Sequence, residues 1–299
     1  LFRSKIYIVG GESAVSNTAK KQLESVTKNI ERLAGDDRHT TSVAVAKAMG
    51  SFKDAFVVGA KGEADAMSIA AKAAELKAPI IVNGWNDLSA DAIKLMDGKE
   101  IGIVGGSNNV SSQIENQLAD IDKDRKVQRV EGETRHDTNA KVIEKFYTDT
   151  NLSNLYVTKD GSKNENQLID SLAVGVLAAK NESPIVLVGN KLNTKQRDIL
   201  STKKLNTITQ VGGNGNEEAF DEIKSLQEKT VFEAKTVEEL TDMINIASPN
   251  DIINFKPKEN TVNEAFRMVT NKPITVNIKG DCSKTLTVDM PNGEVNNYA

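Results

Sequence analysis

Apolar positions along the chain fall into two alternating patterns. Short runs of Ile, Val, Leu, Phe and Ala are bounded by Gly or Pro, and longer stretches between them are amphipathic or rich in alanine. This alternation is the signature of a βαβα chain. The pattern predicts strands over 55–58, 80–82 and 101–104. It predicts helices over 41–49, 65–76, 88–96 and 111–118.

The order of elements recurs further along the chain. The predicted strands in this later part of the chain, such as 184–188, consist almost entirely of Ile, Val and Leu. This composition is typical of strands in a parallel sheet that is covered on both faces. Two helices, near 66–74 and 173–179, are rich in alanine. We interpret those alanines as packing residues that let a helix approach a sheet closely.

Several landmarks repeat at a spacing of about 100 residues. Arg32, Gly35, Arg38, His39 and Thr41 recur 97 positions later as Arg129, Gly132, Arg135, His136 and Thr138. A Gly-Gly pair follows an apolar run three times, at 10–11, 105–106 and 212–213. The chain is therefore predicted to be an array of modules, and a duplicated module favours binding to a repetitive ligand over catalysis.

The repeat sets the expected domain boundaries. Residues 1–28 are the C-terminal part of a first module, 29–125 a second and 126–228 a third. Each module is expected to be a small three-layer α/β unit with a mostly parallel sheet. Residues 229–299 begin a separate, partial β-rich domain, for which a β-solenoid is one candidate architecture. Its strands are expected at 274–278 and 285–289, where apolar and polar residues alternate.

Composition narrows the functional classes. Hydrophobic residues make up 38% and charged residues 27% of the 299 positions, and no apolar run approaches the ~18 residues that span a bilayer. The net charge of −4 disfavours a nucleic-acid binder. A single cysteine, Cys282, excludes an internal disulfide framework. Because the first residue is Leu1 rather than Met, we expect that an N-terminal segment is missing from this sequence.

Two sets of repeated residues are candidates for ligand contact. Gly105, Gly106, Gly212 and Gly213 each follow a strand and precede a helix, where free N–H groups suit a phosphate or carboxylate. The alternative is that a tight strand-to-helix turn simply needs glycine. The pairs lack the further glycines of a dinucleotide-binding loop and the Gly-Lys-Ser/Thr of a phosphate loop.

The repeated arginines offer a planar fork for carboxylate or phosphate oxygens, and the adjacent imidazoles of His39 and His136 add a donor for a sugar hydroxyl. The alternative is that Arg38 and Arg135 pair internally with Asp65 and Asp170. We favour that internal role for these two and assign Arg32 and Arg129, with the Gly-Gly turns, to the ligand. No nucleophile stands beside a plausible base, and no cluster has metal-ligand spacing, so we expect no catalysis, metal or cofactor.

With these motifs in place, the chain resembles the cell wall binding repeat 2 family of Gram-positive S-layer and cell wall proteins. The resemblance covers roughly residues 5–228 and rests on 35–41, 132–138, 64–68, 78–82, 183–187 and the three Gly-Gly turns. It implies that three modules pack around a pseudo-threefold axis and bind an anionic wall polysaccharide. The aliphatic element that the family links to wall attachment falls on Ile80, Ile81, Ile185 and Val186.

The chain departs from the family pattern at His39 and His136, where tyrosine is common, and at Glu133-Thr134. From the resemblance we expect that about 70 further residues, which this sequence does not contain, would complete the first module. We expect a secreted, non-catalytic anchor that holds a surface protein in the cell wall or S-layer through an anionic polysaccharide, with other S-layer proteins as further candidate partners. The alternatives are an enzyme acting on wall glycan or sugar phosphate, and a structural protein of the S-layer lattice.

Overall fold

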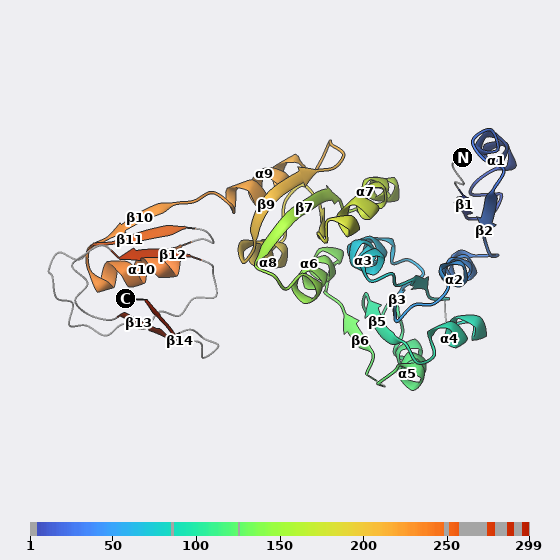
Figure 1. The fold of residues 1–299 in the computed structure, drawn as a ribbon, viewed down its shortest axis with the longest axis horizontal. Coiled ribbons are helices and arrows are strands. Elements are labelled where there is room, and N and C mark those ends of the chain that lie inside the picture. The colour runs from blue at the N-terminus through green and yellow to red at the C-terminus, as the bar shows by residue number, and fades with distance from the viewer. Residues whose placement is uncertain are drawn as a thin grey trace.

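The computed structural model describes residues 5–84, 87–124, 126–247, 251–256 and 274–278, together with the backbone of 286–289 and 295–298. Two α/β units follow a small N-terminal sheet, and a β-rich part follows them (Figure 1). We call the two α/β units the second and third units, after the sequence modules that supply most of their residues. The N-terminal sheet pairs β1 (Ile6–Val9) in parallel with β2 (Ile30–Leu33), and helix α1 (Asn17–Leu23) connects them.

The second unit contains a four-stranded parallel sheet in the order β4-β3-β5-β6. Its elements are α2 (Arg38–Met49), β3 (Asp54–Val58), α3 (Glu63–Glu75), β4 (Ile80–Val82), α4 (Ala90–Met96), β5 (Glu100–Val104), α5 (Ser112–Ile121) and β6 (Gln128–Val130). Strand β6 completes this sheet, although the sequence repeat assigns residues 128–130 to the third module. The chain therefore passes from the second unit to the third after β6. The domain boundaries expected from the sequence repeat stay a prediction.

The third unit has a three-stranded parallel sheet in the order β8-β7-β9. Its elements are α6 (Arg135–Phe146), β7 (Asn151–Lys159), a 3-10 turn at Glu165–Leu168, α7 (Ile169–Lys180), β8 (Ile185–Val188), α8 (Thr194–Ser201), β9 (Lys204–Gln210) and α9 (Glu217–Ser225). The predicted tandem α/β units with mostly parallel sheets are therefore confirmed.

The central strand β3 of the second unit's sheet buries side chains on both faces, as its sequence predicts. Ala55 and Val57 of β3 pack in a core with helices α2, α4 and α5, whereas Phe56 and Val58 pack in a core with α3 and α6. Successive side chains of a strand point to opposite faces, so a strand covered on both sides must be apolar throughout. Strand β8 shows the same rule, because all four of its side chains are at most 1% exposed.

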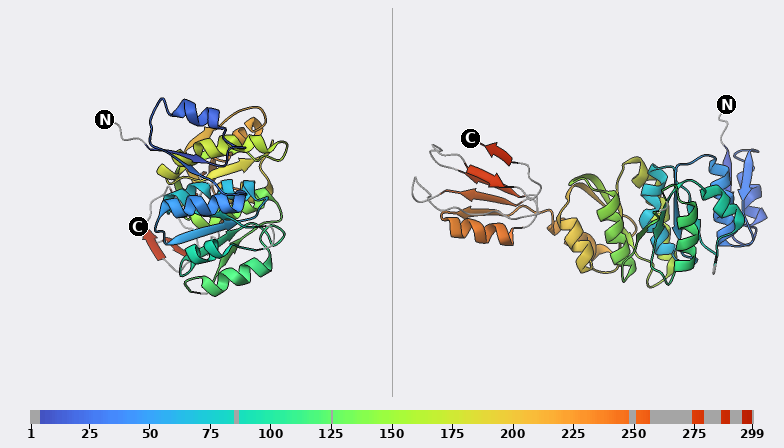
Figure 2. Two further views of the ribbon diagram at one scale, coloured as in Figure 1. Left: turned by 90° about the vertical axis from the view of Figure 1, so that its right-hand side faces the viewer. Right: turned by 90° about the horizontal axis from the view of Figure 1, so that it is seen from below.

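Helix α3 joins the two units. One side of it, at Ile69 and Ala73, packs against the second sheet, and the other side, at Ala64 and Ala71, packs with α7 and the third sheet. Alanine at positions 64, 71 and 73 lets neighbouring elements approach closely on both sides of α3. The expected packing role holds for these buried alanines, whereas Ala74 and Ala173 are exposed. The views in Figure 2 show the two units stacked side by side along the long axis.

The C-terminal part is a separate unit with its own sheet. Strands β10 (Val231–Ala234), β11 (Ile252–Phe255) and β12 (Thr275–Ile278) form a parallel sheet, and helix α10 (Val237–Ile246) packs on it through a small apolar core. Strands β13 (Leu286–Asp289) and β14 (Val295–Tyr298) pair antiparallel. Strands were expected at 274–278 and 285–289 and are found there. The predicted solenoid stays a prediction, because much of 257–299, Cys282 included, lies outside the described residues.

Candidate binding site

Arg129 holds the loop that follows the second Gly-Gly turn. Its guanidinium donates to the backbone carbonyls of Gly105, at 2.7 Å, and Val110, at 2.9 Å, and pairs with Glu115 at 2.9 Å. Arg32 makes equivalent carbonyl contacts of 2.7 to 3.1 Å to the loop after β1. We assigned these two arginines to the ligand from the sequence. In the structure their guanidinium groups fix the loops of their own units, and contact of either arginine with a polymer stays a prediction.

The first glycine of the second and of the third Gly-Gly turn makes room for a carboxylate. Gly105 has φ +116°, and a Cβ added to it would lie 2.5 Å from Oδ2 of Asp65, at the start of α3 in the same unit. Gly212 lies in the same way against Asp170. The N–H of Gly105 donates to the carbonyl of Val130 in the sheet. This glycine N–H is therefore not available to an anion, contrary to the expectation for the Gly-Gly turns; contact of Gly106 or Gly213 with a polymer stays a prediction.

Arg38 and Arg135 make one contact in common. Each donates from Nη1 to a carbonyl at the end of the central strand of its unit, Arg38 to Ala60 at 3.1 Å and Arg135 to Asp160 at 2.9 Å. Arg38 also pairs with Glu63 at 2.7 Å. The predicted pairs with Asp65 and Asp170 are thus wrong: a lysine of the third unit, not Arg135, is the neighbour of Asp170.

The two histidines occupy equivalent sequence positions but have different environments. His39 is 7% exposed and bridges the carbonyl of Val82, at 2.6 Å, and the hydroxyl of Ser89, at 2.8 Å. His136 lies 2.8 Å from a carboxylate oxygen of Asp160. Burial alone would raise the pKa of Asp160, but its hydrogen bonds with His136 and Ser162 outweigh burial and lower the pKa to about 2.

The aliphatic elements that the family resemblance assigned to the wall are core residues in this structure. Ile81 and Val186 are fully buried, Ile185 is 1% exposed, and each belongs to a hydrophobic cluster of its sheet. Ile80 is partly buried against the core beneath α3. These side chains therefore stabilise the strands that carry the site, and their surfaces are covered by neighbouring residues.

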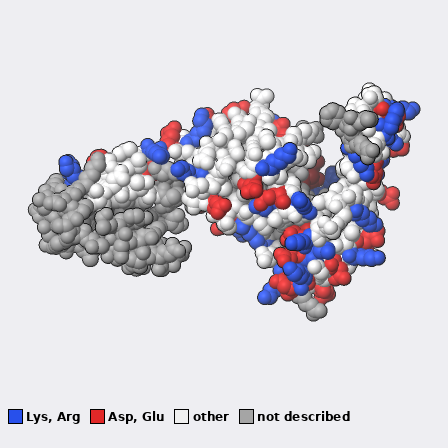
Figure 3. Space-filling model, in the orientation of Figure 1, with Lys and Arg blue, Asp and Glu red and all other residues white. Residues whose placement is uncertain are grey.

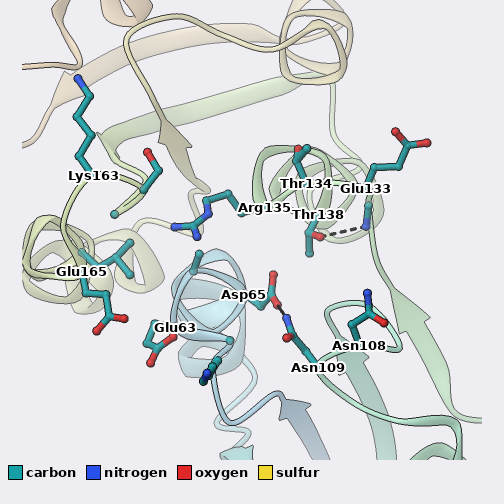
Figure 4. Close-up of a pocket in the computed structure, with 18 of the residues that line it drawn as sticks. Glu63, Asp65, Asn108, Asn109, Glu133, Thr134, Arg135, Thr138, Lys163 and Glu165 are labelled. Carbon is teal, nitrogen blue, oxygen red and sulfur yellow. Dashed lines mark hydrogen bonds between the residues drawn. The ribbon is translucent and has the colours of Figure 1, made fainter.

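A polar cleft of about 800 Å³ lies at the junction of the second and third units (Figure 4). It lies beside the N-terminal ends of α3 and α6 and the loops after β5 and β7. Charged residues from both units line it: Arg38, Lys61, Glu63, Asp65, Glu133, Arg135, Lys163 and Glu165. Amide and hydroxyl groups line the rest: Asn108, Asn109, Thr134, Thr138, Ser162 and Asn164. Such a mixture suits a ligand with many hydroxyl groups and some charge.

Arg135 and Asp65 face this cleft from different units, as Figure 4 shows. Asp65 is 6% exposed, and an oxygen of its carboxyl lies 3.5 Å from the side-chain nitrogen of Asn109. Burial raises the pKa of Asp65 to about 6, although Asn109 and the positive charge of Arg135 both act to lower it. The sequence identified both residues but did not bring them together, because they lie 70 positions apart and in different modules.

The charge around the cleft is balanced. Four of the lining residues named above are cationic and four are acidic. Lysine, arginine and acidic side chains also intermingle over the face of the molecule in Figure 3. Within the described residues no group of histidine, cysteine and acidic side chains could hold a metal ion, and none of the helices there is long and apolar enough to cross a membrane.

Comparison with known proteins decides the family. The profile of cell wall binding domain 2 (CWB2) matches residues 32–115 and 129–217, which together are more than half of the chain. The chain belongs to this family. It is a family of cell-wall-binding domains in Gram-positive surface proteins, so the matched part of the chain is a binding module that associates with the cell wall.

Two curated proteins of Bacillus subtilis are similar in sequence to this chain. The chain is 29% identical over 211 residues to the N-acetylmuramoyl-L-alanine amidase LytC of Bacillus subtilis, covering 69% of this chain and 40% of that protein. It is 32% identical over 186 residues to the amidase enhancer of the same organism, covering 61% of this chain and 24% of that protein. The chain thus spans less than half the length of these two relatives.

Two solved structures from Clostridium difficile have the same fold. Cwp8 matches with a TM-score of 0.69 at 45% identity, covering 74% of this chain and 38% of Cwp8. Cwp6 matches with the same TM-score at 25% identity, covering 84% of this chain and 51% of Cwp6. The tandem arrangement of parallel-sheet units is therefore shared with these two Clostridium difficile proteins.

Proposed function

We propose that this chain is the wall-anchoring part of a secreted surface protein and holds that protein by binding an anionic wall polysaccharide in the cleft between CWB2 units. The observation that carries the proposal is the cleft itself, with Arg135 at its centre and amide and hydroxyl groups on its walls. Hydroxyl groups of a sugar need both donors and acceptors, and an acidic group needs a cation.

Arg135 is better placed than Arg129 for this role. Within the described part of the chain the Arg135 guanidinium donates one hydrogen bond, to the carbonyl of Asp160, and the residue is exposed in the cleft. Arg129 has only 11% of its side chain exposed and contacts two carbonyls and a carboxylate of its own unit. An ionic ligand therefore has free donors to reach at Arg135.

Tandem units explain how a protein can be retained on a wall even if each of its binding sites is weak. A second unit of the same chain meets a neighbouring repeat of the polymer at the high effective concentration set by the first, so modest contacts combine. We propose no catalytic role for the CWB2 units. In the third unit Asp160 lies between His136 and Ser162, accepting from the hydroxyl at 2.8 Å, so the imidazole is not the group that would take a proton from this serine.

Sedimentation with purified Gram-positive cell walls tests the proposal. The chain is expected to co-sediment with intact walls and to stay in the supernatant when the anionic polymer has first been extracted. Equal sedimentation with both preparations would contradict polysaccharide binding. Release of soluble fragments from the walls would favour an enzyme, and sedimentation of the protein alone would favour a lattice protein.

A further inference from the structure

Asp65 and Asp170 occupy the same place in successive units but have different electrostatic partners. Each lies in the first turn of an alanine-rich helix, against the first glycine of its Gly-Gly turn. Asp170 has the ammonium group of Lys159 3.7 Å away, in its own unit. This lysine is an ionic partner from the same unit.

The second unit has no lysine at the corresponding position. Strands β3 and β7 align through their pairing with β4 and β8, Phe56 with Ile80 and Tyr156 with Ile185, so Lys159 corresponds to Gly59. A Cβ at Gly59 would lie 2.5 Å from Cβ of Asn109, so no side chain fits there. Arg135, across the unit junction, supplies a positive charge that acts to lower the pKa of Asp65.

Other charged groups surround this pair. Glu63 on the same helix is paired with Arg38. The remaining groups that line the cleft come from the loop before α3, the start of α6 and the loop after β7: Lys61, Glu133, Lys163 and Glu165. Glu131 lies close to the second glycine of the loop after β5. With Asp65 ionised the cationic and acidic lining residues balance, and with Asp65 protonated one positive charge is in excess beside Arg135.

We propose, building on the proposed function, that Asp65 and Arg135 form a proton-linked anion site. The acidic group of a wall sugar binds at Arg135 together with one proton on Asp65, and binding weakens as Asp65 ionises. Two negative charges near one guanidinium in a partly desolvated cleft repel each other, whereas a neutral carboxyl can donate a hydrogen bond to the ligand. The ligand class is a sugar that carries one permanent negative charge, a carboxylate or a phosphodiester.

Binding of small probes at two pH values tests this inference. The probes are the methyl glycoside of glucuronic acid and glucose 1-(methyl phosphate), whose charges stay constant between pH 5.5 and 7.5, with methyl glucoside as the neutral control. Since the pKa of Asp65 is raised to about 6, a strict requirement for its proton makes binding roughly 25-fold tighter at pH 5.5 than at pH 7.5. NMR shift titrations of the whole chain give the dissociation constants and show which of the two anions binds.

Matched variants separate Asp65 from other titrating groups. Imidazoles as a class also titrate between pH 5 and 8, so the pH effect must disappear in Asp65→Asn and persist in Asp170→Asn. If Asp65→Asn folds poorly, the carboxyl ¹³C shift of Asp65 in the wild type gives the same information, because saturating probe should raise its pKa. Equal affinity of the wild type at both pH values, or a pH effect that survives Asp65→Asn, overturns the inference.

Wall sedimentation distinguishes the two proposals. A chain that sediments with walls but binds neither anion overturns the proton-linked site and leaves wall anchoring intact. A chain that binds the anions with the expected pH dependence, yet does not sediment with walls, contradicts the anchoring function while supporting the site.

Discussion

Gly105 lies against the carboxyl group of Asp65, so close that a Cβ on the glycine would be 2.5 Å from Oδ2. The contact ties the loop after β5 to the start of α3. Gly105→Ala should lower the free energy of unfolding by about 2 to 4 kcal/mol, because the residue has φ +116° and the new methyl group meets a buried carboxyl. Urea unfolding followed by circular dichroism measures the change.

Gly106→Ala is the control for this substitution. Its added Cβ would have one neighbour, an oxygen of Glu131, at 3.5 Å, which is an ordinary contact. We expect it to change the free energy of unfolding by less than about 1 kcal/mol. If the two alanine variants were equally stable, the close approach of Gly105 to Asp65 would not contribute to the stability of the fold.

Arg129→Ala should destabilise the second unit. The substitution leaves the carbonyls of Gly105 and Val110 and the carboxylate of Glu115 without their donor, which costs about 1 to 3 kcal/mol. Arg129→Lys should recover only part of the loss, since an ammonium group cannot reproduce the planar fork. Lys123→Ala, which removes an exposed ion pair with Glu100, is the control and should change stability by less than about 1 kcal/mol. A variant Arg129→Ala as stable as the wild type would refute the structural role.

The Asp160 carboxylate should stabilise the fold in a pH-dependent way. Its pKa falls from an ordinary value near 3.8 to about 2 in the folded chain, because hydrogen bonds with His136 and Ser162 outweigh burial. A carboxyl with a depressed pKa adds stability that is present above about pH 4 and is lost as the pH falls towards 2. Asp160→Asn should therefore cost about 2 kcal/mol at pH 7 and markedly less at pH 3. Urea titrations of both proteins at the two pH values provide the test, and a constant difference would argue against the assignment.

Salt should weaken retention on walls. Exposed charges in water are screened over a Debye length of about 10 Å at 0.1 M salt, and Arg135 and Lys163 are exposed at the cleft. Sedimentation with walls is expected to fall steadily between ~50 and ~500 mM salt. Retention that does not change over this range would show that hydroxyl hydrogen bonds, rather than charge pairing, dominate binding.

The fold was largely predictable because strands such as β3 and β8 are buried on both faces. A run such as 185–188 has no polar face, and that pattern fits a parallel sheet between helices and little else. The crossing of the chain after β6 was not predictable. A repeat marks where similar residues recur, but it does not show that residues 128–130 pair with the preceding strand rather than with strands of the next unit.

The sequence could not separate the roles of the four repeated arginines, for a physical reason. All four side chains have the same chemistry, and position alone decides whether backbone carbonyls or solvent lie within reach. Arg129 stands on the strand beside β5, next to the Gly-Gly loop, whereas Arg135 stands at the start of a helix that opens onto the junction between units. The sequence could not show that junction, because Asp65 and the loop after β7 reach it from different modules.

Retention of Arg135→Ala on purified walls, with thermal stability measured on the same sample, tests the central claim most directly. Arg197→Ala, which removes an ion pair between helix α8 and Glu222 on helix α9, is the matched control. We expect Arg135→Ala to melt within a few degrees of the wild type and to lose at least tenfold in wall affinity, equivalent to about 1.4 kcal/mol, while Arg197→Ala binds normally. An Arg135→Ala protein that folds and sediments with walls as well as the wild type would contradict the placement of the polymer site in this cleft.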